Sequence, residues 1–372
     1  MERCRDYAGS VFYMLMKVLH YLIFTGLACA CVPGNKEATK ETAAPVNSPL
    51  AAIKPKKVTQ KVANDTDDPA IWINREDPAK SLIIGTDKGN EEGIGALYVF
   101  DLNGKIVDSV NNIQRPNNVD IAYDFSLGNE RVDIAVCTER YTHSIRVFRL
   151  PSMTPIDNGG IPVFVGDTLR SPMGVALFTE PASNTFYAIV GRKYGPKDGY
   201  LWQYELSSES GAVRAKLVRK FGKFSGVKEI EAIAVDSELG YVYYSDENVG
   251  VRKYYAHPDS SNTELALFAT EGFTDDHEGI SIFKKDNTSG YILVSDQQAN
   301  KFHIYPREGT GGNVHQHPRL KTVLLSTLDS DGSEVTNAAL NDTFTRGLFV
   351  AMSDDGTFHY YHWQDIAGED LK

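Results

Sequence analysis

The chain has 372 residues, enough for one large domain or two of ordinary size. Hydrophobic residues make up 42% and charged residues 23%, which excludes a chain that is disordered along its whole length. The formal charge of −11, from 38 Lys and Arg against 49 Asp and Glu, argues against a nucleic-acid partner, which would require a basic face. Of the four cysteines, only Cys137 lies beyond the N-terminal segment, so the body of the chain cannot hold an internal disulfide.

The first 31 residues have the features of an export signal. Residues 18–31 (VLHYLIFTGLACAC) form an apolar run that follows Lys17 and is short for a membrane-spanning helix, so we interpret residues 1–31 as a signal peptide. The end of this run resembles a bacterial lipoprotein processing site, although neither Cys29 nor Cys31 has a Leu three positions earlier. The sequence predicts an exported protein and leaves open whether it is periplasmic, secreted or lipid-anchored at a bacterial envelope.

A tether and an acidic domain follow the signal. Residues 32–54 are polar and rich in Ala, Lys and Pro, which predicts a disordered segment. Residues 62–372 carry 29 basic and 45 acidic side chains, a net charge of −16. We expect residues 55–372 to form one folded, strongly acidic domain that is monomeric and has no membrane contact beyond a lipid anchor.

In this domain one sequence unit recurs six times. Each unit contains a short apolar strand that ends in a small residue and a polar pair, as in SLIIGTDK (81–88) and YILVSDQ (291–297). Another strand precedes it, as in HEGISIF (277–283), and an aromatic-rich strand follows it. The short apolar strand that ends in a polar pair recurs at intervals of 50 to 57 residues. It begins at Leu82, Asp133, Phe186, Tyr241, Tyr291 and Leu348.

This repeat predicts an all-β fold, a six-bladed β-propeller with four-stranded blades around a central channel. The sixth unit ends near Trp363 and leaves little chain for its own fourth strand. We therefore expect residues 55–63 to supply that strand and close the ring. Helical periodicity of useful length is absent from the sequence, which argues against a helical domain.

Propeller geometry brings charged positions together at one mouth of the channel, because the first strand of each blade starts there and the second strand ends there. In blades one to three the second strands end in Lys88, Arg140 and Lys193, which predicts a basic arc. The other half of the ring carries an acidic arc. The carboxylates expected at this mouth are Asp67, Asp68, Glu231, Glu247, Asp276 and Glu278.

Converging carboxylates repel one another, and a bound cation relieves that repulsion. An all-oxygen ligand set with Gln297 as a neutral member suits calcium, whereas the scarcity of His, with His277 alone in this set, argues against zinc. A basic arc opposite bound cations suits a phosphate ester, whose hydrolysis metal ions assist by activating water. We therefore expect several calcium ions and a phosphoric monoester hydrolase.

The strings DTDDPAIWIN (65–74), NNVDIAYDF (117–125), IEAIAVD (230–236) and DDHEGISIF (275–283) resemble those of the β-propeller phytases, and the likeness runs in order through all six units. These calcium-dependent enzymes release phosphate from myo-inositol hexakisphosphate (phytate). The resemblance implies a metal set, which is Asp67, Asp68, Glu231, Glu247, Asp276, Glu278, Gln297 and Asp331.

The resemblance also implies roles in the reaction. Its catalytic carboxylates would be Asp67, Glu231, Glu247, Asp276 and Glu278. A water that bridges calcium ions would attack one phosphate while a neighbouring phosphate occupies an affinity site. The lysines that bind phosphate in the family match Lys88 and Lys193.

Three positions depart from the pattern of the family. Ala122 stands where its members have Arg, Met173 where they have Tyr, and Asn337 where they have Asp. The missing guanidinium would leave a gap beside Arg140, which Arg140 itself, Arg115 or Arg192 could fill. We therefore expect the phosphate-binding set to be Lys88, Arg140, Arg192 and Lys193. Phosphomonoesterase chemistry is better supported than a strict preference for phytate.

Two other functions stay open at the level of the sequence. A calcium-dependent propeller lactonase or esterase would need a His or Asn ligand shell and would leave the basic arc without a purpose. A non-catalytic surface-binding propeller would use calcium for structure alone. The fold by itself does not separate these functions from a phosphatase.

Overall fold

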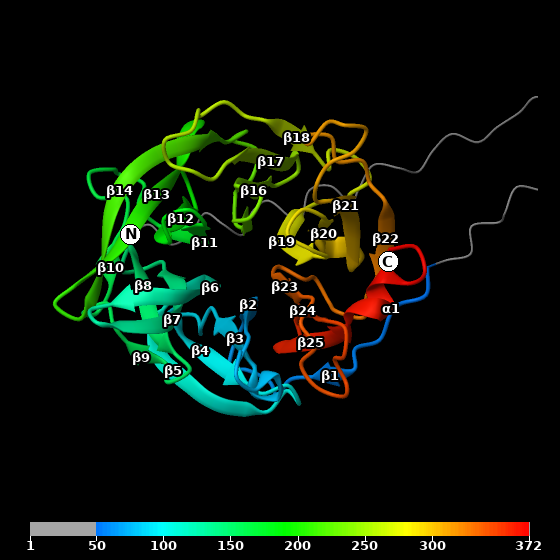
Figure 1. Cartoon of the computed structure of the whole chain (residues 1–372), viewed down its shortest axis with the longest axis horizontal. Helices are drawn as coiled ribbons and strands as arrows, with labels where there is room; N and C mark the ends of the chain where they lie inside the picture. Colours follow the sequence, from blue (N-terminus) through cyan, green and yellow to red (C-terminus); the bar gives the residue numbers. More distant parts are fainter. Residues whose placement is uncertain (1–49, 372) are drawn as a thin grey trace, which may run out of the picture. The chain divides into compact units, whose positions relative to one another are not determined.

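Each repeat unit folds as one antiparallel sheet, and the sheets lie side by side in a ring (Figure 1). The computed structural model describes residues 50–371. Within this range the fold is an all-β, six-bladed propeller, as the repeat predicted. Helical structure is limited to η1 (Pro78–Lys80), η2 (Gln297–Ala299) and α1 (Trp363–Ala367). No helix of the described part is long and apolar enough to span a membrane.

The first three blades follow one another in the chain. Blade one contains β2 (Thr66–Trp72), β3 (Leu82–Asp87), β4 (Ile94–Phe100) and β5 (Ile106–Gln114). Blade two contains β6 (Pro116–Leu127), β7 (Glu130–Glu139), β8 (Ser144–Leu150) and two short outer pieces, β9 (Thr154–Pro155) and β10 (Ile161–Pro162), which both pair with β8. Blade three contains β11 (Pro172–Glu180), β12 (Thr185–Arg192), β13 (Asp198–Glu209) and β14 (Ala212–Lys223).

The last three blades complete the ring. Blade four contains β15 (Ile233–Asp236), β16 (Tyr241–Asp246), β17 (Gly250–Tyr255) and β18 (Ala266–Phe268). Blade five contains β19 (His277–Lys284), β20 (Gly290–Asp296), β21 (Lys301–Pro306) and β22 (Lys321–Leu324). Blade six contains β23 (Ser333–Thr336), β24 (Leu348–Ser353), β25 (Thr357–His362) and, from the other end of the chain, β1 (Lys57–Val58).

The N-terminal strand closes the ring, as the sequence predicted. Lys57 and Val58 of β1 lie opposite Tyr360 and His359 of β25. Beyond β1, Thr59 N donates to the carbonyl of Phe358 at 3.0 Å, and Phe358 N donates to Thr59 Oγ1 at 2.8 Å. The predicted signal peptide and the predicted tether up to residue 49 lie outside the described residues. In the rest of the tether, Ile53 forms a bridge with Leu325.

The apolar core is divided among the contacts between blades. Six buried clusters lie in the described part, and each joins one blade to the next. The cluster between blades six and one, for example, joins Ile71 and Ile83 to Phe358 and Tyr360. At the same contact a Cβ on Gly85 would lie 2.3 Å from the ring of Phe358, so only glycine fits there. Because the cores lie between blades, the axis of the ring is left for polar groups.

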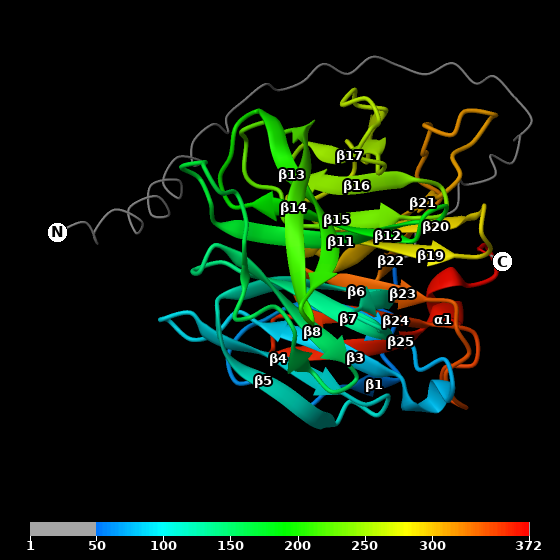
Figure 2. The same cartoon turned by 60° about the vertical axis from the view of Figure 1, so that its left-hand side comes forward.

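The sheets are seen one above another when the ring is viewed from the side (Figure 2). In five of the blades the second strand, the one that the repeat pattern identifies most clearly, is buried along almost its whole length: β3, β12, β16, β20 and β24. Neighbouring sheets cover both of its faces, so its residues are continuously apolar rather than alternating. This packing holds the residues at the ends of these strands in fixed positions around the axis.

Candidate active site

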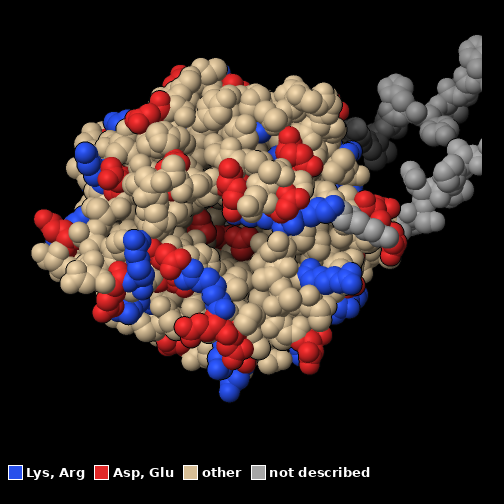
Figure 3. Space-filling view, in the orientation of Figure 1, with Lys and Arg blue, Asp and Glu red and all other residues tan. Residues whose placement is uncertain are grey.

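Two cavities lie on the axis of the ring. A tunnel of about 450 Å³ is lined by the first strands of all six blades, with aliphatic side chains interspersed with the carboxylates of Asp68, Asp120 and Glu334. A smaller hollow of about 190 Å³ has only one apolar residue, Met173, among the twelve that line it. Figure 3 shows the ring face-on, with acidic side chains in the depth of its central opening. Most of the residues that line the hollow are charged, and acidic and basic side chains occur together there.

One side of the hollow is built from carboxylates. Glu229, Glu231 and Glu247 bring one oxygen each to within 4.8 Å of one another, and so do Glu247, Asp276 and Glu278. Glu247 belongs to both groups and is fully buried. The two groups therefore form one continuous acidic cluster on blades four and five, as the sequence predicted for four of its five members.

Some of these oxygens have no hydrogen-bond partner. They are Oε1 of Glu247 and Oε2 of Glu278, whereas Oε2 of Glu247 and Oε2 of Glu229 contact lysine ammonium groups. Burial, with the negative charge of Glu229, raises the pKa of Glu247 to about 7. Burial and the charge of Glu247 likewise raise the pKa of Glu278 well above its usual value. A cluster of buried, unsatisfied oxygen atoms is the environment that a hard divalent cation satisfies.

Backbone contacts between blades fix the position of these carboxylates. A Cβ on Gly174 would lie 1.9 Å from the carbonyl oxygen of Glu231, so the start of β11 lies directly against the backbone two residues before β15. Ser245 Oγ donates to the carbonyl of Glu278 at 2.9 Å. The carboxylate of Asp276 accepts from Gln298 Nε2 at 2.6 Å and from Asn248 Nδ2 at 2.9 Å.

Asp67 extends the acidic side toward blade one. It is buried at the start of β2, and its Oδ2 accepts a hydrogen bond from Asn117 Nδ2 at 2.9 Å. The same amide nitrogen lies 3.4 Å from Glu231 Oε1, so Asn117 links Asp67 to the acidic cluster. Burial and the charge of Asp67 raise the pKa of Glu231 well above its usual value.

Asp331 and Gln297 complete this side. Gln297 donates through Nε2 to Asp331 Oδ1 and accepts from Gln298 Nε2 at 2.6 Å. Burial raises the pKa of Asp331 to about 6. Both side chains line the hollow, so the structure brings together all the predicted cation ligands except Asp68.

Basic side chains also line the hollow. They are Lys88, Arg115 and Arg140 from blades one and two, Lys193 from blade three, and Lys228, which lies beside the acidic cluster. The Nε atoms of Arg115 and Arg140 are buried without a hydrogen-bond partner. Arg115 also has a φ of 57°, a conformation that is uncommon for residues other than glycine and that occurs more often at functional sites.

The three lysines form ion pairs with the acidic side. Lys88 Nζ lies 2.9 Å from Asp331 Oδ2 and 3.2 Å from Asp67 Oδ1. Lys193 pairs with Glu229. Lys228 Nζ lies 3.0 Å from Glu247 Oε2 and 2.5 Å from Asp276 Oδ2.

The hollow combines buried carboxylates with basic side chains, an arrangement that can accommodate an anionic ligand. A sequence model of the family described as Phytase matches residues 19–360. The chain belongs to the phytase family. A 3-phytase of Bacillus subtilis (strain 168) is 30% identical over 320 residues, which cover 81% of this chain and 80% of that protein. The chain is therefore a 3-phytase-like hydrolase, as the sequence motifs predicted.

Two solved structures are similar in fold only. The Dos1 propeller has a TM-score of 0.42 and 12% identity, with 80% of this chain and 68% of that chain covered. A chain of the mitotic checkpoint complex has a TM-score of 0.48 and 9% identity, with 90% of this chain and 98% of that chain covered. At these values we draw nothing further from either structure.

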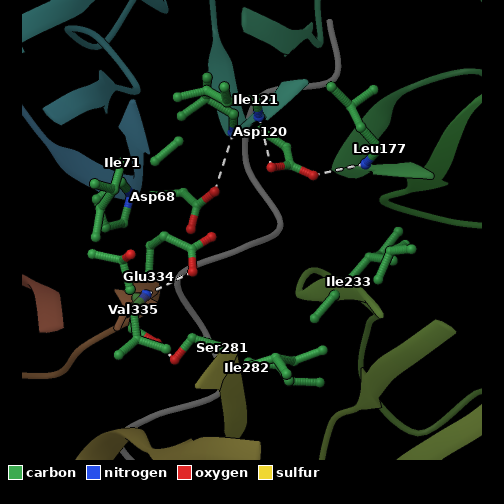
Figure 4. A pocket seen from close by; sticks show the side chains of 18 of the residues that line it. Asp68, Ile71, Asp120, Ile121, Leu177, Ile233, Ser281, Ile282, Glu334 and Val335 are labelled. Carbon is green, nitrogen blue, oxygen red and sulfur yellow. Dashed lines mark hydrogen bonds between the residues drawn. The ribbon is translucent and has the colours of Figure 1, made fainter. Parts of the chain in front are cut away.

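The structure places one predicted metal ligand of this phytase-family chain apart from the others. Asp68 lines the tunnel instead of the hollow. In the tunnel its carboxylate points into the same cavity as those of Asp120 and Glu334 (Figure 4). Asp68 Oδ2 accepts from Val119 N at 3.1 Å. Neighbouring residues of a strand project to opposite sides, so Asp67 and Asp68 face different cavities.

The structure also corrects the expected positions of the three residues that depart from the family pattern, Ala122, Met173 and Asn337. Only Met173 lies at the hollow, where its sulfur contacts Arg140 Nη2. Ala122 lines the tunnel and pairs with Ile134 in the middle of blade two, so it does not lie beside Arg140. Asn337 follows the end of β23 and lines the tunnel.

Arg192 is absent from the residues that line the hollow. Its guanidinium is fully buried, pairs with Asp167 at 2.9 Å, and lies 4.4 Å from the ring centre of Phe164 and 5.3 Å from that of Trp202. Its Nε donates to the carbonyl of Tyr200 at 3.1 Å. These contacts occupy the side chain within blade three, so we remove Arg192 from the phosphate-binding set.

The motif analysis missed three side chains of the hollow: Asn117, Lys228 and Glu229. Lys228 and Glu229 belong to the string KEIE (228–231), in which three charged residues come immediately before a first strand. That density of charge at a predicted channel mouth is a signal that could have identified them. Asn117 lies in the NNVDI motif, but nothing in the sequence distinguishes it from Asn118.

Proposed function

We propose that this phytase-family chain is a calcium-dependent phosphoric monoester hydrolase that releases phosphate from phytate. The observation that carries the proposal is the combination of charges at the hollow. Buried carboxylates with unsatisfied oxygens and two arginines with unsatisfied Nε atoms lie at the same cavity. Such a cavity accommodates a ligand with negative charge on one side and cations on the other.

The carboxylates would hold the calcium. Glu231, Glu247, Asp276 and Glu278 offer closely spaced oxygens, and Asp67, Gln297 and Asp331 lie next to them. Oxygen donors of mixed charge fit calcium better than zinc. Bound calcium would supply the positive charge that offsets the phosphoryl oxygens and activates a water for attack. The number of ions stays a prediction.

The basic residues would hold the substrate. Arg115 and Arg140 each have free donors in the hollow, and a guanidinium can bind a phosphate through two parallel hydrogen bonds. Lys88 and Lys193 border the same cavity from blades one and three. An inositol with several phosphates would let one phosphate bind among these groups while another faces the carboxylates.

Phosphate release tests the function. The chain is freed of metal and assayed on phytate and on an aryl phosphate, with and without added calcium. We expect release from phytate only with calcium, because the carboxylates by themselves would repel the substrate. Equal activity in excess chelator would refute calcium dependence. Hydrolysis of a lactone without phosphate release would favour the lactonase alternative, and calcium binding without any turnover would favour a binding propeller.

We further propose that residues 1–31 direct export and that residues 55–372 act as a monomer. The export segment lies outside the described residues, so the proposal rests on its sequence pattern alone. Mass analysis of the mature protein would distinguish a cleaved N-terminus from one that carries lipid, and retention of residues 1–31 would refute the signal peptide. Light scattering tests the monomer.

A further inference from the structure

Lys228 lies where a cation would be expected. It precedes β15, lines the hollow, and places its ammonium 3.0 Å from Glu247 and 2.5 Å from Asp276. Both carboxylates are buried, whereas the Lys228 side chain is 40% exposed. The stem of the lysine is therefore exposed to solvent, and its ammonium contacts two carboxylates of the acidic cluster on blades four and five.

Few other groups neutralise these carboxylates. Glu247 Oε1 makes no hydrogen bond, Glu247 Oε2 contacts Lys228, and the other charged neighbours of Glu247 are acidic: Glu229, Glu231, Asp276 and Glu278. The Lys228 ammonium lies 2.5 Å from Asp276 Oδ2 and 3.0 Å from Glu247 Oε2, so it belongs to the charge balance of the metal-free chain.

We propose that Lys228 is an exchangeable counter-ion that sets the calcium affinity of the acidic cluster. In the metal-free protein its ammonium bridges Glu247 and Asp276, and a divalent cation that binds these carboxylates displaces it. The inference rests on the proposed calcium binding. Because the Lys228 side chain is 40% exposed and lies in the loop before β15, it can leave the cluster without unfolding a blade.

The inference predicts two opposite effects of removing the positive charge. Calcium no longer competes with the ammonium, so its affinity rises. The metal-free protein loses the cation that offsets two buried carboxylates, so it becomes less stable. A residue that only supported the local fold would weaken calcium binding and stability together.

Calcium titration calorimetry and thermal unfolding of metal-free protein test this. The variants are Lys228→Gln, which keeps a hydrogen-bond donor without charge, and Lys228→Arg, which keeps the charge. Lys56→Met is the matched control, because Lys56 forms an exposed ion pair with Asp365 at 2.9 Å on blade six. We expect Lys228→Gln to bind calcium about tenfold more tightly and to unfold at a lower temperature without metal. We expect the other two variants to bind calcium as the unsubstituted chain does.

The outcomes separate this inference from the proposed function. A gain in calcium affinity of less than threefold for Lys228→Gln, or an equal gain for Lys56→Met, would refute the proposed counter-ion role of Lys228. Failure of the unsubstituted chain to bind calcium overturns the proposed function as well. If Lys228→Gln does not fold without metal, it is prepared with calcium and its affinity is measured by titration with a competing chelator.

Discussion

At the scale of single residues, Arg140 and Arg192 show how one type of side chain serves two purposes. Arg140 lines the hollow and leaves its buried Nε without a partner. Arg192 is enclosed by Phe164, Trp202 and Asp167, and its donors are used by blade three itself. The first side chain is available to a substrate, whereas the second is part of the fold.

We predict that replacing these arginines has different consequences. Arg140→Ala should raise the KM for phytate about tenfold or more with little change in kcat, because a hydrogen bond to a charged group contributes about 1.5–3 kcal/mol. Arg192→Met should leave KM unchanged and lower the unfolding temperature, since breaking a buried ion pair costs about 3–5 kcal/mol. Steady-state kinetics and thermal unfolding of both variants check this. A rise in KM for Arg192→Met at unchanged stability would contradict the assignment.

A second prediction concerns the acidic cluster. Asp276→Asn and Glu231→Gln each remove one negative charge from the proposed calcium site and change the volume little. We expect most of the turnover to be lost while the fold is kept, with Glu130→Gln, an exposed change on blade two, as the control. Turnover and unfolding temperature are measured at saturating calcium. Turnover equal to that of the unsubstituted chain would exclude the residue from the site.

Individual residues at the mouth were predictable only in part. The ends of second strands could be read from the repeat, and Lys88, Arg140 and Lys193 do line the hollow. The direction of a side chain at an irregular strand start could not be predicted from the repeat. The register of β2 shifts between Thr66 and Pro69, and the Asp68 side chain is directed into the tunnel. Lys228 was missed because it lies in the loop before β15, outside the repeated strands.

At the scale of elements, the ring depends on a two-residue strand. β1 extends its contact with β25 through Thr59, which donates and accepts backbone hydrogen bonds with Phe358. The strand itself contributes little apolar surface, since Val58 is exposed. Backbone pairing is therefore the main contribution of β1 to closure.

We predict that Thr59→Pro weakens the closure. Proline removes the donor to Phe358 O and the hydroxyl acceptor for Phe358 N, whereas Thr59→Ala removes the hydroxyl alone. Each lost partner costs about 1–3 kcal/mol, so the unfolding temperature should fall for Ala and fall further for Pro. Chemical denaturation of both variants measures this. If both equal the unsubstituted chain in stability, the N-terminal strand does not hold the ring.

The repeat predicted the elements well because strands buried on both faces leave a strong apolar signal. Outer strands leave a weaker one, and blade two accordingly has two short pieces, β9 and β10, in place of a single outer strand. The first strand of blade six, β23, also leaves a weak signal. Its apolar content is a single buried Val335 between polar residues.

At the scale of the whole molecule, burial raises the pKa of several carboxyl groups at or near the two cavities. Burial raises the pKa of Glu334 to about 8, of Glu247 to about 7, and of Asp120 and Asp331 to about 6. In the unfolded chain these groups return to ordinary values near 4. Between about pH 4 and pH 8 the native, metal-free protein therefore binds more protons than the unfolded one.

The sign of the pH dependence follows from this difference. Because raised carboxyl pKa values stabilise the fold only while the groups hold protons, the metal-free protein should become less stable as pH rises from 5 to 8. With calcium the trend should reverse, since the ions need deprotonated carboxylates. Unfolding temperatures at pH 5, 6, 7 and 8, with metal removed and with calcium added, check the prediction. Parallel trends in the two series would contradict it.

The closing strand also determines when the fold can be completed. Residues 57 and 58 are among the first part of the ring to leave the ribosome, and their partners at 359 and 360 are among the last. About 300 residues must be synthesised before β1 can pair with β25. The apolar cluster of Ile71 with Phe358 and Tyr360 stays incomplete for the same time. Contacts so distant in sequence form slowly, and their surfaces are exposed to aggregation until they form. A nascent chain can build its middle blades early, but it becomes a ring only after its last blade has been made.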